Sequence, residues 1–340
     1  MATVLFLAHL EDGGALPRVA LEVLGGAERL AQDLDASLAV GLVGADVQTA
    51  ADGIADCGGT FYAVSGEAFG VSRYATDAAA FTALIEAAQA SVVLAPGTSR
   101  MARCMPGVAQ RLDGRIDTHV TGIDVVDGAP QIERWFYRQR MVARLNRSQQ
   151  PWFMLVDSGV FEARDGMAGT ATVEQLDVKP PELRTEVVGK EAPAVEAQTI
   201  RPDADVLFVA GAGWTKKQAD GQTHVSDAEK LIKGFLDASQ ASLGSSKSLV
   251  DQAGEGQEVI SFMTHMNQVG QTGSTPRHPK GLAACCHGEE PHVVGWRFIK
   301  ERRAINLDPG CGWARGKADV LYVADAFAVI EKVNRLLAGE

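Results

Sequence analysis

The strongest constraint on the fold is the alternation of short apolar runs with longer segments in the first half of the chain. Apolar runs that suit buried strands occupy residues 4–8 and 37–43, and residues 17–34 between them have helical periodicity, with Pro17 suited to the first turn. The alternation continues through residues 60–64, 81–90 and 91–95, followed by a loop at residues 96–99 and a helix at residues 100–112. Apolar strands separated by helices form a mainly parallel sheet that is covered on both faces. The first half is therefore predicted to be a doubly wound α/β domain.

Beyond Ile123 the sequence pattern changes. Residues 131–142 and 151–156 are rich in aromatic and branched side chains and are predicted as extra β segments. Within the first of them, Trp135-Phe136-Tyr137 favours strand packing over a stacking platform for bases. Residues 180–202 are polar, contain proline and lack a clear periodicity, which is typical of an interdomain linker.

The second half starts the α/β pattern again. Residues 205–210 form an apolar strand, and Gly211-Ala212-Gly213 follows as a turn. Ser226-Asp227-Ala228-Glu229 predicts a capping box at the start of a helix. Short strands and glycine turns then lead to a final helix at residues 326–337. A chain of 340 residues can form two cores, so two α/β domains are predicted, residues 1–195 and 196–340.

Composition narrows the functional classes. The net charge of −11 argues against nucleic-acid binding, which needs a basic face. The apolar run at residues 4–8 is too short to span a membrane and follows no basic segment, so neither membrane insertion nor a signal peptide is expected. An odd number of cysteines without a CxxC pair favours reduced, buried thiols and a cytoplasmic location. These cysteines are Cys57, Cys104, Cys285, Cys286 and Cys311.

Two polar turns suit an anion, and the residues alone leave both open. Gly211-Ala212-Gly213 lies between a strand and a helical segment, where backbone N–H groups can face a phosphate. Position 216, where the dinucleotide fingerprint needs a third glycine, is lysine, so a purely structural turn is an equal alternative. Leu243-Gly244-Ser245-Ser246-Lys247-Ser248 offers hydroxyls and one cation, but a solvated serine-rich turn fits it equally well.

The most specific polar stretch is Gln268-Val269-Gly270-Gln271-Thr272-Gly273. Its glycines permit close backbone approach, and the amide and hydroxyl between them favour holding a polar cofactor. Further on, His287 and His292 flank Gly288-Glu289-Glu290-Pro291, an interval that is unusual for metal ligands. A histidine that faces a cofactor oxygen is therefore favoured over a metal site. The sequence contains neither GxSxG nor a Walker A motif, so a nucleophile has no local support.

Residues 205–337 resemble the FAD-binding domain of the electron-transfer flavoprotein alpha subunit. The first half is similar in the order of its elements but looser in sequence. The resemblance implies a Rossmann-like FAD-binding domain at the C-terminus and an N-terminal domain that packs on a beta subunit. The motifs that carry it are the stretch from Gln268 to Gly273, the segment from Gly288 to His292, Ala304-Ile305-Asn306-Leu307-Asp308-Pro309, Ala318-Asp319 and Val323-Ala324-Asp325-Ala326-Phe327.

The resemblance also implies a role for each site residue, with no catalytic residue and no metal. Ser246 and Lys247 would lie near the flavin, the Thr272 hydroxyl near N5, and His292 at the pyrimidine oxygen, where a donor or cation stabilises the reduced flavin. The segment from His287 to Pro291 would approach the phosphates, and Asn306 and Asp325 the adenosine part. The full expected set is Ala212, Ser246, Lys247, Val269, Gly270, Gln271, Thr272, His287, Gly288, Glu289, Glu290, Pro291, His292, Asn306, Asp325 and Ala326.

By the same resemblance, the chain is expected to be an electron carrier rather than an enzyme. Its beta subunit would hold AMP, a flavin-containing dehydrogenase would donate electrons, and a quinone oxidoreductase or similar protein would accept them. The divergence of the sequence suggests a dedicated donor, for example a dehydrogenase of amines or methylated amines.

Several positions depart from the family pattern. Ala212 and Lys247 stand in place of arginines, and lysine lacks the planar fork of arginine. His287 replaces a serine, Ser274 replaces a lysine, and an insertion lies within residues 251–267. Ala212 and Lys247 motivate one alternative, a nucleotide-binding scaffold or regulatory subunit that has lost electron transfer. A further alternative is a freestanding enzyme on a similar fold, such as a flavin-dependent oxidoreductase.

Overall fold

The computed structural model describes residues 2–136, 141–189, 200–201, 204–252, 258–269, 276–285, 299–311, 314–315 and 318–339. The chain divides into two compact units, Met1–Lys190 and Glu191–Glu340. The domain boundary expected at residue 195 falls within residues 190–199, outside the described residues.

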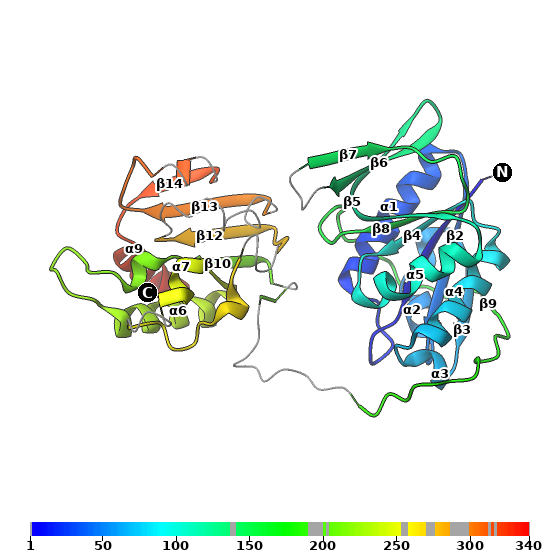
Figure 1. Cartoon of the computed structure of the whole chain (residues 1–340), viewed down its shortest axis with the longest axis horizontal. Helices are drawn as coiled ribbons and strands as arrows, with labels where there is room; N and C mark the ends of the chain where they lie inside the picture. Colours follow the sequence, from blue (N-terminus) through cyan, green and yellow to red (C-terminus); the bar gives the residue numbers. More distant parts are fainter. Residues whose placement is uncertain are drawn as a thin grey trace. The chain divides into compact units, whose positions relative to one another are not determined.

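In the N-terminal unit, nine strands of the described chain form one sheet in the order β7-β6-β5-β8-β4-β1-β2-β3-β9 (Figure 1). The seven strands from β5 to β9 in this order are parallel, whereas β6 and β7 extend the sheet in antiparallel fashion. The predicted mainly parallel sheet with extra β segments is therefore confirmed. The strands are β1 (Thr3–His9), β2 (Ser37–Gly44), β3 (Thr60–Ser65), β4 (Val92–Pro96), β5 (Arg115–Val126), β6 (Ala129–Phe136), β7 (Met141–Leu145), β8 (Trp152–Val156) and β9 (Val173–Gln175).

The helices of this unit cover both faces of the sheet because each central strand is apolar on both sides. In β1, Val4 and Phe6 belong to one buried cluster with α1, whereas Leu5 and Leu7 belong to a second cluster with α4 and α5. This alternation follows from the two-residue period of a strand. The helices are α1 (Arg18–Asp33), α2 (Gln48–Asp52), the 3₁₀ turn η1 (Ala55–Cys57), α3 (Glu67–Gly70), α4 (Tyr74–Ala88) and α5 (Ser99–Arg111).

The prediction of one β segment at residues 131–142 is wrong, because this range contains parts of two antiparallel strands, β6 and β7. The β5–β6 hairpin turns at Asp127-Gly128, and both residues have the positive φ that favours such a turn. Phe136, expected to pack within a strand, is 55% exposed. Strands β5 and β9 were not predicted, because β5 is only partly buried and β9 is short.

Smaller corrections concern the ends of helices. Pro17 has extended backbone at the N-cap of α1 and does not lie in its first turn. The loop expected at residues 96–99 is shorter, because Pro96 ends β4 and Ser99 begins α5, whose N-cap is Thr98.

A buried charge network ties the extension to the parallel strands. The carboxylate of Asp117 is 1% exposed and accepts hydrogen bonds from Trp152 Nε1 at 3.0 Å, Arg147 Nε at 3.0 Å and Arg134 Nη1 at 3.2 Å. The three donors satisfy a charge that would otherwise be costly to bury.

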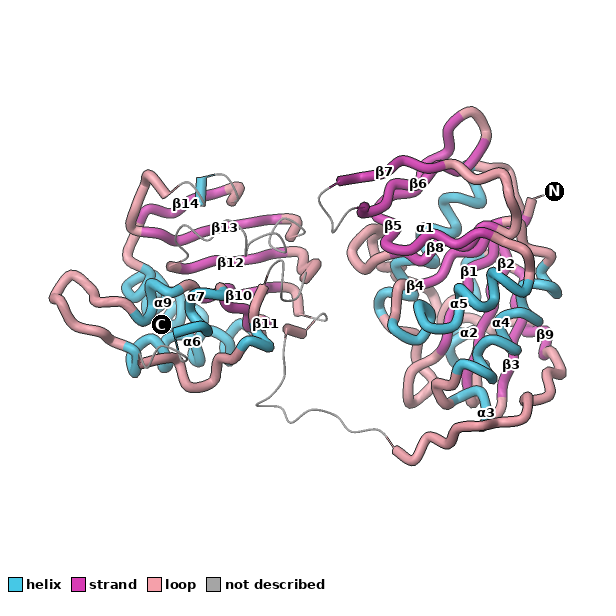
Figure 2. Tube along the Cα trace, in the orientation of Figure 1, coloured by secondary structure: helices cyan, strands magenta, loops and turns pink. Residues whose placement is uncertain are grey.

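In the C-terminal unit, the described strands form a parallel sheet in the order β11-β10-β12-β13-β14 (Figure 2). Numbered within the unit, this is the order 2-1-3-4-5 of doubly wound folds, and it confirms the expected second α/β domain. The strands are β10 (Val206–Ala210), β11 (Ser242–Ser245), β12 (Lys280–Ala284), β13 (Glu301–Asn306) and β14 (Val320–Val323). The helices are η3 (Ala212–Thr215), α6 (Val225–Ser239), α7 (Lys247–Asp251), η5 (His265–Asn267) and α9 (Ala326–Leu337).

The final helix lies where the sequence predicted it, but the capping box does not form. Helix α6 has His224 at its N-cap without a side-chain hydrogen bond, and Ser226 lies inside the helix. The carboxylate of Glu229 instead accepts a hydrogen bond from the backbone N–H of Ser261 at 2.5 Å, so it is not available for the cap. Within the described part of the chain, no helix combines the length and apolar character needed to cross a membrane.

Candidate functional site

The carboxyl ends of the five parallel strands of the C-terminal unit meet at one edge of the sheet. The register pairs Ala210 with both Ser245 and Ala284, and Asn306 with Val323. Strand β10 lies between β11 and β12. The next strand along the chain, β11, lies on one side of β10, and the later strands lie on the other side, so the strand order reverses at β10. Ligands of open α/β sheets bind outside the carboxyl ends of the strands at such a reversal.

Most of the expected site residues in the described part of the chain follow these strand ends directly. Ala212 follows β10, Ser246 and Lys247 follow β11, and Asn306 ends β13. Asp325 follows β14 and caps α9, where its Oδ1 accepts a hydrogen bond from the Phe327 N–H at 2.9 Å. Residues that span more than one hundred positions in the sequence are thereby brought to one edge.

The serine-rich segment is a strand end and not a solvated turn. Ser245 and Ser246 are buried, and the Ser246 N–H donates to the Ala210 carbonyl at 2.8 Å. The Ser246 hydroxyl caps α7 by accepting from the Leu249 N–H at 3.4 Å. Lys247 therefore begins α7 at a fixed place, with its side chain 40% exposed.

The glutamine-glycine signature begins beside the same strand. Gln268 forms a parallel bridge with Ser245, and the Val269 N–H donates to the Ser245 carbonyl at 3.0 Å. A Cβ atom on Gly244 would lie 2.7 Å from Val269 Cγ2, so glycine is needed for this close packing. Gly270, Gln271, Thr272 and the segment 287–292 with its two histidines lie outside the described residues.

A pocket of about 160 Å³ opens at this edge. Among the expected residues, it is lined by Asn306, Asp325 and Ala326, and Gly213 of the glycine turn also contributes. Ala212 itself is 1% exposed and packs in the core beside the pocket. The pocket thus joins the glycine turn to the ends of β13 and β14.

Two lysines that the sequence reasoning did not select also line this pocket. Lys216 and Lys217 are exposed and follow the η3 turn directly. A pair of cations immediately after a glycine turn is a signal for an anion site that the sequence contained. The lining also includes Cys285, and burial, with a smaller contribution from the charge of Asp325, raises its thiol pKa to about 12.

The donor set at this edge fits a polar dinucleotide. Lys216, Lys217 and Lys247 supply positive charge, and Asp325 supplies a carboxylate. The Ser245 hydroxyl and Trp214 Nε1 are buried and have no hydrogen-bond partner among the described residues. Cations suit phosphates, and a carboxylate suits ribose hydroxyls. No group of three metal-ligating side chains occurs in the described ranges.

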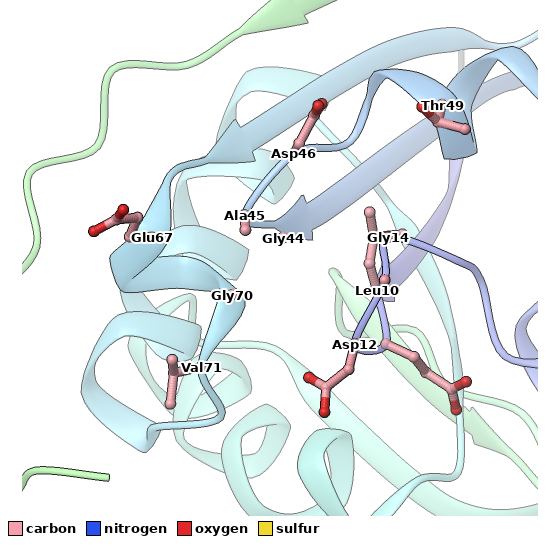
Figure 3. Close-up of a pocket in the computed structure, with 12 residues that line it drawn as sticks. Leu10, Asp12, Gly14, Gly44, Ala45, Asp46, Thr49, Glu67, Gly70 and Val71 are labelled. Atoms are coloured by element: carbon pink, nitrogen blue, oxygen red, sulfur yellow. The ribbon is translucent and has the colours of Figure 1, made fainter. Parts of the chain in front are cut away.

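A second hollow, of about 520 Å³, lies at the carboxyl ends of β1, β2 and β3 in the N-terminal unit (Figure 3). Its lining includes Glu11, Asp12, Asp46 and Glu67. In Figure 3 the labelled side chains of Asp46 and Glu67 point outward from the hollow. Four carboxylates without a lining cation disfavour an anionic ligand, so the cofactor site is better sought in the C-terminal unit.

The chain is similar to known proteins along almost its whole length. The sequence model of the electron transfer flavoprotein domain matches residues 4–181, which is more than half of the chain and the part in which the resemblance was looser. The chain is 26% identical over 338 residues to the electron transfer flavoprotein subunit alpha of Thermoanaerobacterium thermosaccharolyticum, with 96% of both chains covered. It is 26% identical over 331 residues to the subunit of the same name from Syntrophomonas wolfei, with 97% of both covered. Protein FixB of Clostridium saccharobutylicum is 26% identical over 336 residues, which is 95% of this chain and 91% of that protein.

These relatives extend through the C-terminal unit and its polar edge, beyond the residues that the domain model matches. The chain therefore belongs to the electron transfer flavoprotein family, which supports a role in electron transfer and implies a flavin cofactor, and along almost its whole length it resembles the alpha subunits.

Proposed function

We propose that this chain is the alpha subunit of a heterodimeric electron-transfer flavoprotein and that it binds FAD at the carboxyl edge of its C-terminal sheet. The observation that carries the proposal is the convergence of Ser246, Lys247, Asn306 and Asp325 at that edge. Family membership gives the electron-transfer role, and the donor set described above suits a dinucleotide better than a metal or an apolar ligand.

Each end of the cofactor has a matching group in the chain. Asp325 accepts hydrogen bonds from ribose hydroxyls, and Lys216 and Lys217 balance the charge of the phosphates. Lys247 places a cation toward the flavin end, beside the signature that begins at Gln268. The bound flavin supplies the redox chemistry, and these side chains bind it, orient it and stabilise the charge of its reduced form.

Two residues outside the described ranges complete the proposed site. By the family resemblance, the Thr272 hydroxyl would bond flavin N5, where hydrogen-bonding character changes with redox state. His292 would donate to the pyrimidine oxygen, where negative charge gathers on reduction. The segment 287–291 would supply groups for the phosphates.

The proposed partners are the beta subunit, which holds AMP, a flavin-containing dehydrogenase as donor and a quinone oxidoreductase or similar protein as acceptor. The beta subunit is expected to cover apolar side chains that the isolated chain exposes. Those on the antiparallel extension are Phe136, Met141 and Val142, each about half exposed.

The test is the visible spectrum of the co-expressed and purified heterodimer before and after stepwise reduction. Flavin absorbance at one FAD per alpha chain supports the proposal, and a colourless complex that takes up no added FAD rejects it. Thr272→Ala and His292→Ala are expected to alter the spectrum of the half-reduced state. If both leave flavin affinity and redox spectra unchanged, these two residues do not belong to the site.

The donor is identified by mixing the heterodimer with a panel of flavin-containing dehydrogenases, including those of amines and methylated amines. Reduction of the heterodimer by one member of the panel names the donor class. A heterodimer that holds FAD or AMP but is reduced by no dehydrogenase would support the scaffold alternative that Ala212 and Lys247 motivated. Substrate turnover by the isolated chain would instead support a freestanding oxidoreductase.

A further inference from the structure

Lys247 does not stand alone at the proposed flavin site but ends a short network of polar side chains, which continues through Asp251 to His265. Its Nζ lies 3.2 Å from Asp251 Oδ2, and the other oxygen of the same carboxylate, Oδ1, accepts a hydrogen bond from His265 Nε2 at 2.8 Å. Lys247 and Asp251 are the first and last residues of α7, four positions apart, so their side chains share one face of the helix. His265 comes from a different element, the η5 turn.

The two elements that carry this network, α7 and the η5 turn, are each held in place by further hydrogen bonds. The end of α7 is tied to the η3 turn, because Thr215 Oγ1 donates to Gln252 Oε1 at 2.5 Å. The η5 turn is closed by two hydrogen bonds: Thr264 Oγ1 accepts from the Met266 N–H at 3.2 Å, and Asn267 Oδ1 accepts from the Thr264 N–H at 3.1 Å. That turn leads directly into Gln268, which bridges to Ser245.

We propose that Asp251 and His265 are positioning residues that fix the Lys247 ammonium at the flavin and partly offset its charge. The inference rests on the proposed function. It adds how the position and the effective strength of the positive charge beside the flavin are determined. His265 anchors Asp251, and Asp251 holds Lys247.

The electrostatics give the direction of the effect. The hydrogen bond from His265 and the ammonium of Lys247 outweigh the opposing effect of burial and hold the pKa of Asp251 below its usual range, so the carboxylate is ionised at neutral pH. An ionised carboxylate 3.2 Å from an ammonium lowers the positive potential that the ammonium projects. Both side chains are more than one third exposed, so solvent keeps the effect modest.

The main test measures the flavin midpoint potential in the heterodimer with Asp251→Asn, which removes the charge and keeps the shape. The positive charge of Lys247 is then no longer offset by a carboxylate, so the reduced flavin binds more tightly relative to the oxidised flavin. We expect a change of about fivefold in this ratio, comparable to the loss of one exposed ion pair. Since tenfold corresponds to about 30 mV for a two-electron couple, the potential should rise by about 20 mV.

The matched control is Asp319→Asn, which removes the same charge from an ion pair with Arg302 at the opposite, amino edge of the sheet. It should leave the potential unchanged. The decisive comparison repeats Asp251→Asn in a Lys247→Met background. The direct effect of the Asp251 charge on the flavin remains in that background, so the shift should differ in size between the two backgrounds if Asp251 also positions Lys247. A shift of equal size in both backgrounds, or none in either, would overturn the inference.

His265 is tested by rescue. His265→Ala should weaken FAD binding about threefold, as expected for one exposed hydrogen-bonded pair, and His265→Gln should restore it because the amide can donate to the same carboxylate. Equal weakening by both variants would show that the hydrogen bond is not what matters.

A third measurement needs no bound cofactor. In the heterodimer stripped of flavin, acetic anhydride should modify Lys247 about threefold faster after Asp251→Asn than in the wild type, because the amine is released from its ion pair. Lys230, whose side chain is 76% exposed, serves as the internal reference in the same digest. Unchanged acylation of Lys247 contradicts the inference even if no FAD binds, whereas failure to bind FAD in every variant including the wild type rejects the proposed function alone. Asp251→Ser is used in the same assays if Asp251→Asn is insoluble.

Discussion

The contact between Gly244 and Val269 yields a sharp prediction because it joins a strand to the start of the signature. A methyl group at position 244 would lie 2.7 Å from Val269 Cγ2, about 0.7 Å short of ordinary van der Waals contact near 3.4 Å. The next neighbours, Leu207 and Val209, lie at 3.3 Å and 3.4 Å and can accommodate it with small shifts. In Gly244→Ala the Val269 side chain, or the 268–269 segment that carries it, must therefore shift away from β11.

The size of the effect follows from overpacking, which costs about 1–3 kcal/mol in a tight core. The lower backbone entropy of alanine in the unfolded chain returns about 0.4–1 kcal/mol. We expect a net loss of about 1–2 kcal/mol, which lowers the midpoint of thermal flavin release by roughly 2–8 °C for a unit of this size. The affinity for FAD should fall with it, because the displaced segment leads into the proposed flavin contacts.

Val269→Ala provides the matched partner variant. Alone it removes two buried methyl groups and should cost roughly 1.5 kcal/mol. Combined with Gly244→Ala it relieves the clash, so the double variant should be at least about 1 kcal/mol more stable than the sum of the two single losses predicts. The assay is thermal release of flavin fluorescence together with fluorescence titration of FAD. Additive losses, or a Gly244→Ala protein that matches the wild type in both assays, would refute the packing argument.

Three further predictions follow from other parts of the molecule. Asp117→Asn should destabilise the N-terminal unit by about 2–3 kcal/mol in chemical denaturation at pH 7, since it leaves two partly buried arginines without their carboxylate. Burial by itself would raise the pKa of Asp117, but hydrogen bonds from Arg147 and Trp152 outweigh it and hold the pKa below its usual value. The stability that ionised Asp117 contributes is therefore present above the ordinary aspartate pKa and is lost as the pH falls through the folded-state pKa. The free energies of unfolding of the variant and the wild type should converge in acid. A difference that stays constant with pH would contradict the lowered pKa. Burial and the charge of Asp325 raise the pKa of the Cys285 thiol to about 12. Cys285 should therefore resist iodoacetamide at pH 8 in the native protein and react after unfolding, as followed by mass spectrometry. Rapid alkylation of the native protein would contradict the raised pKa. The double variant Lys216→Ala/Lys217→Ala should weaken FAD binding about tenfold and reduce its salt dependence, whereas unchanged affinity at low salt would remove both lysines from the site.

Much of the fold could be predicted because it depends on local patterns. The strands at the centre of the N-terminal sheet are apolar on both faces, as in β1 and β4, so each appears in the sequence as a continuous apolar run. The final helix was placed correctly because Asp325 caps it and its apolar residues recur with helical spacing. The antiparallel extension was misassigned because its strands are half exposed. The Asp127-Gly128 turn was a local signal for the boundary between β5 and β6, and it was not used.

The candidate site, too, could be predicted only in part from the sequence. The polar motifs, the cations and the spacing of four between Lys247 and Asp251 can all be read along the chain. That Asp251 also meets His265, fourteen positions later, cannot be read from spacing, because it depends on how η5 packs beside α7.

What the sequence determined by itself is the class of fold, the identity of the polar motifs and the family they resemble, because periodicity, caps and glycine turns act over a few residues. Only the tertiary structure decided which of those motifs share an edge. Strand order places β10 between β11 and β12, so the ends at Ala210, Ser245 and Ala284 adjoin although they are far apart in the sequence. Strand order is set by long-range pairing and by packing on both faces of the sheet, and no local pattern encodes it.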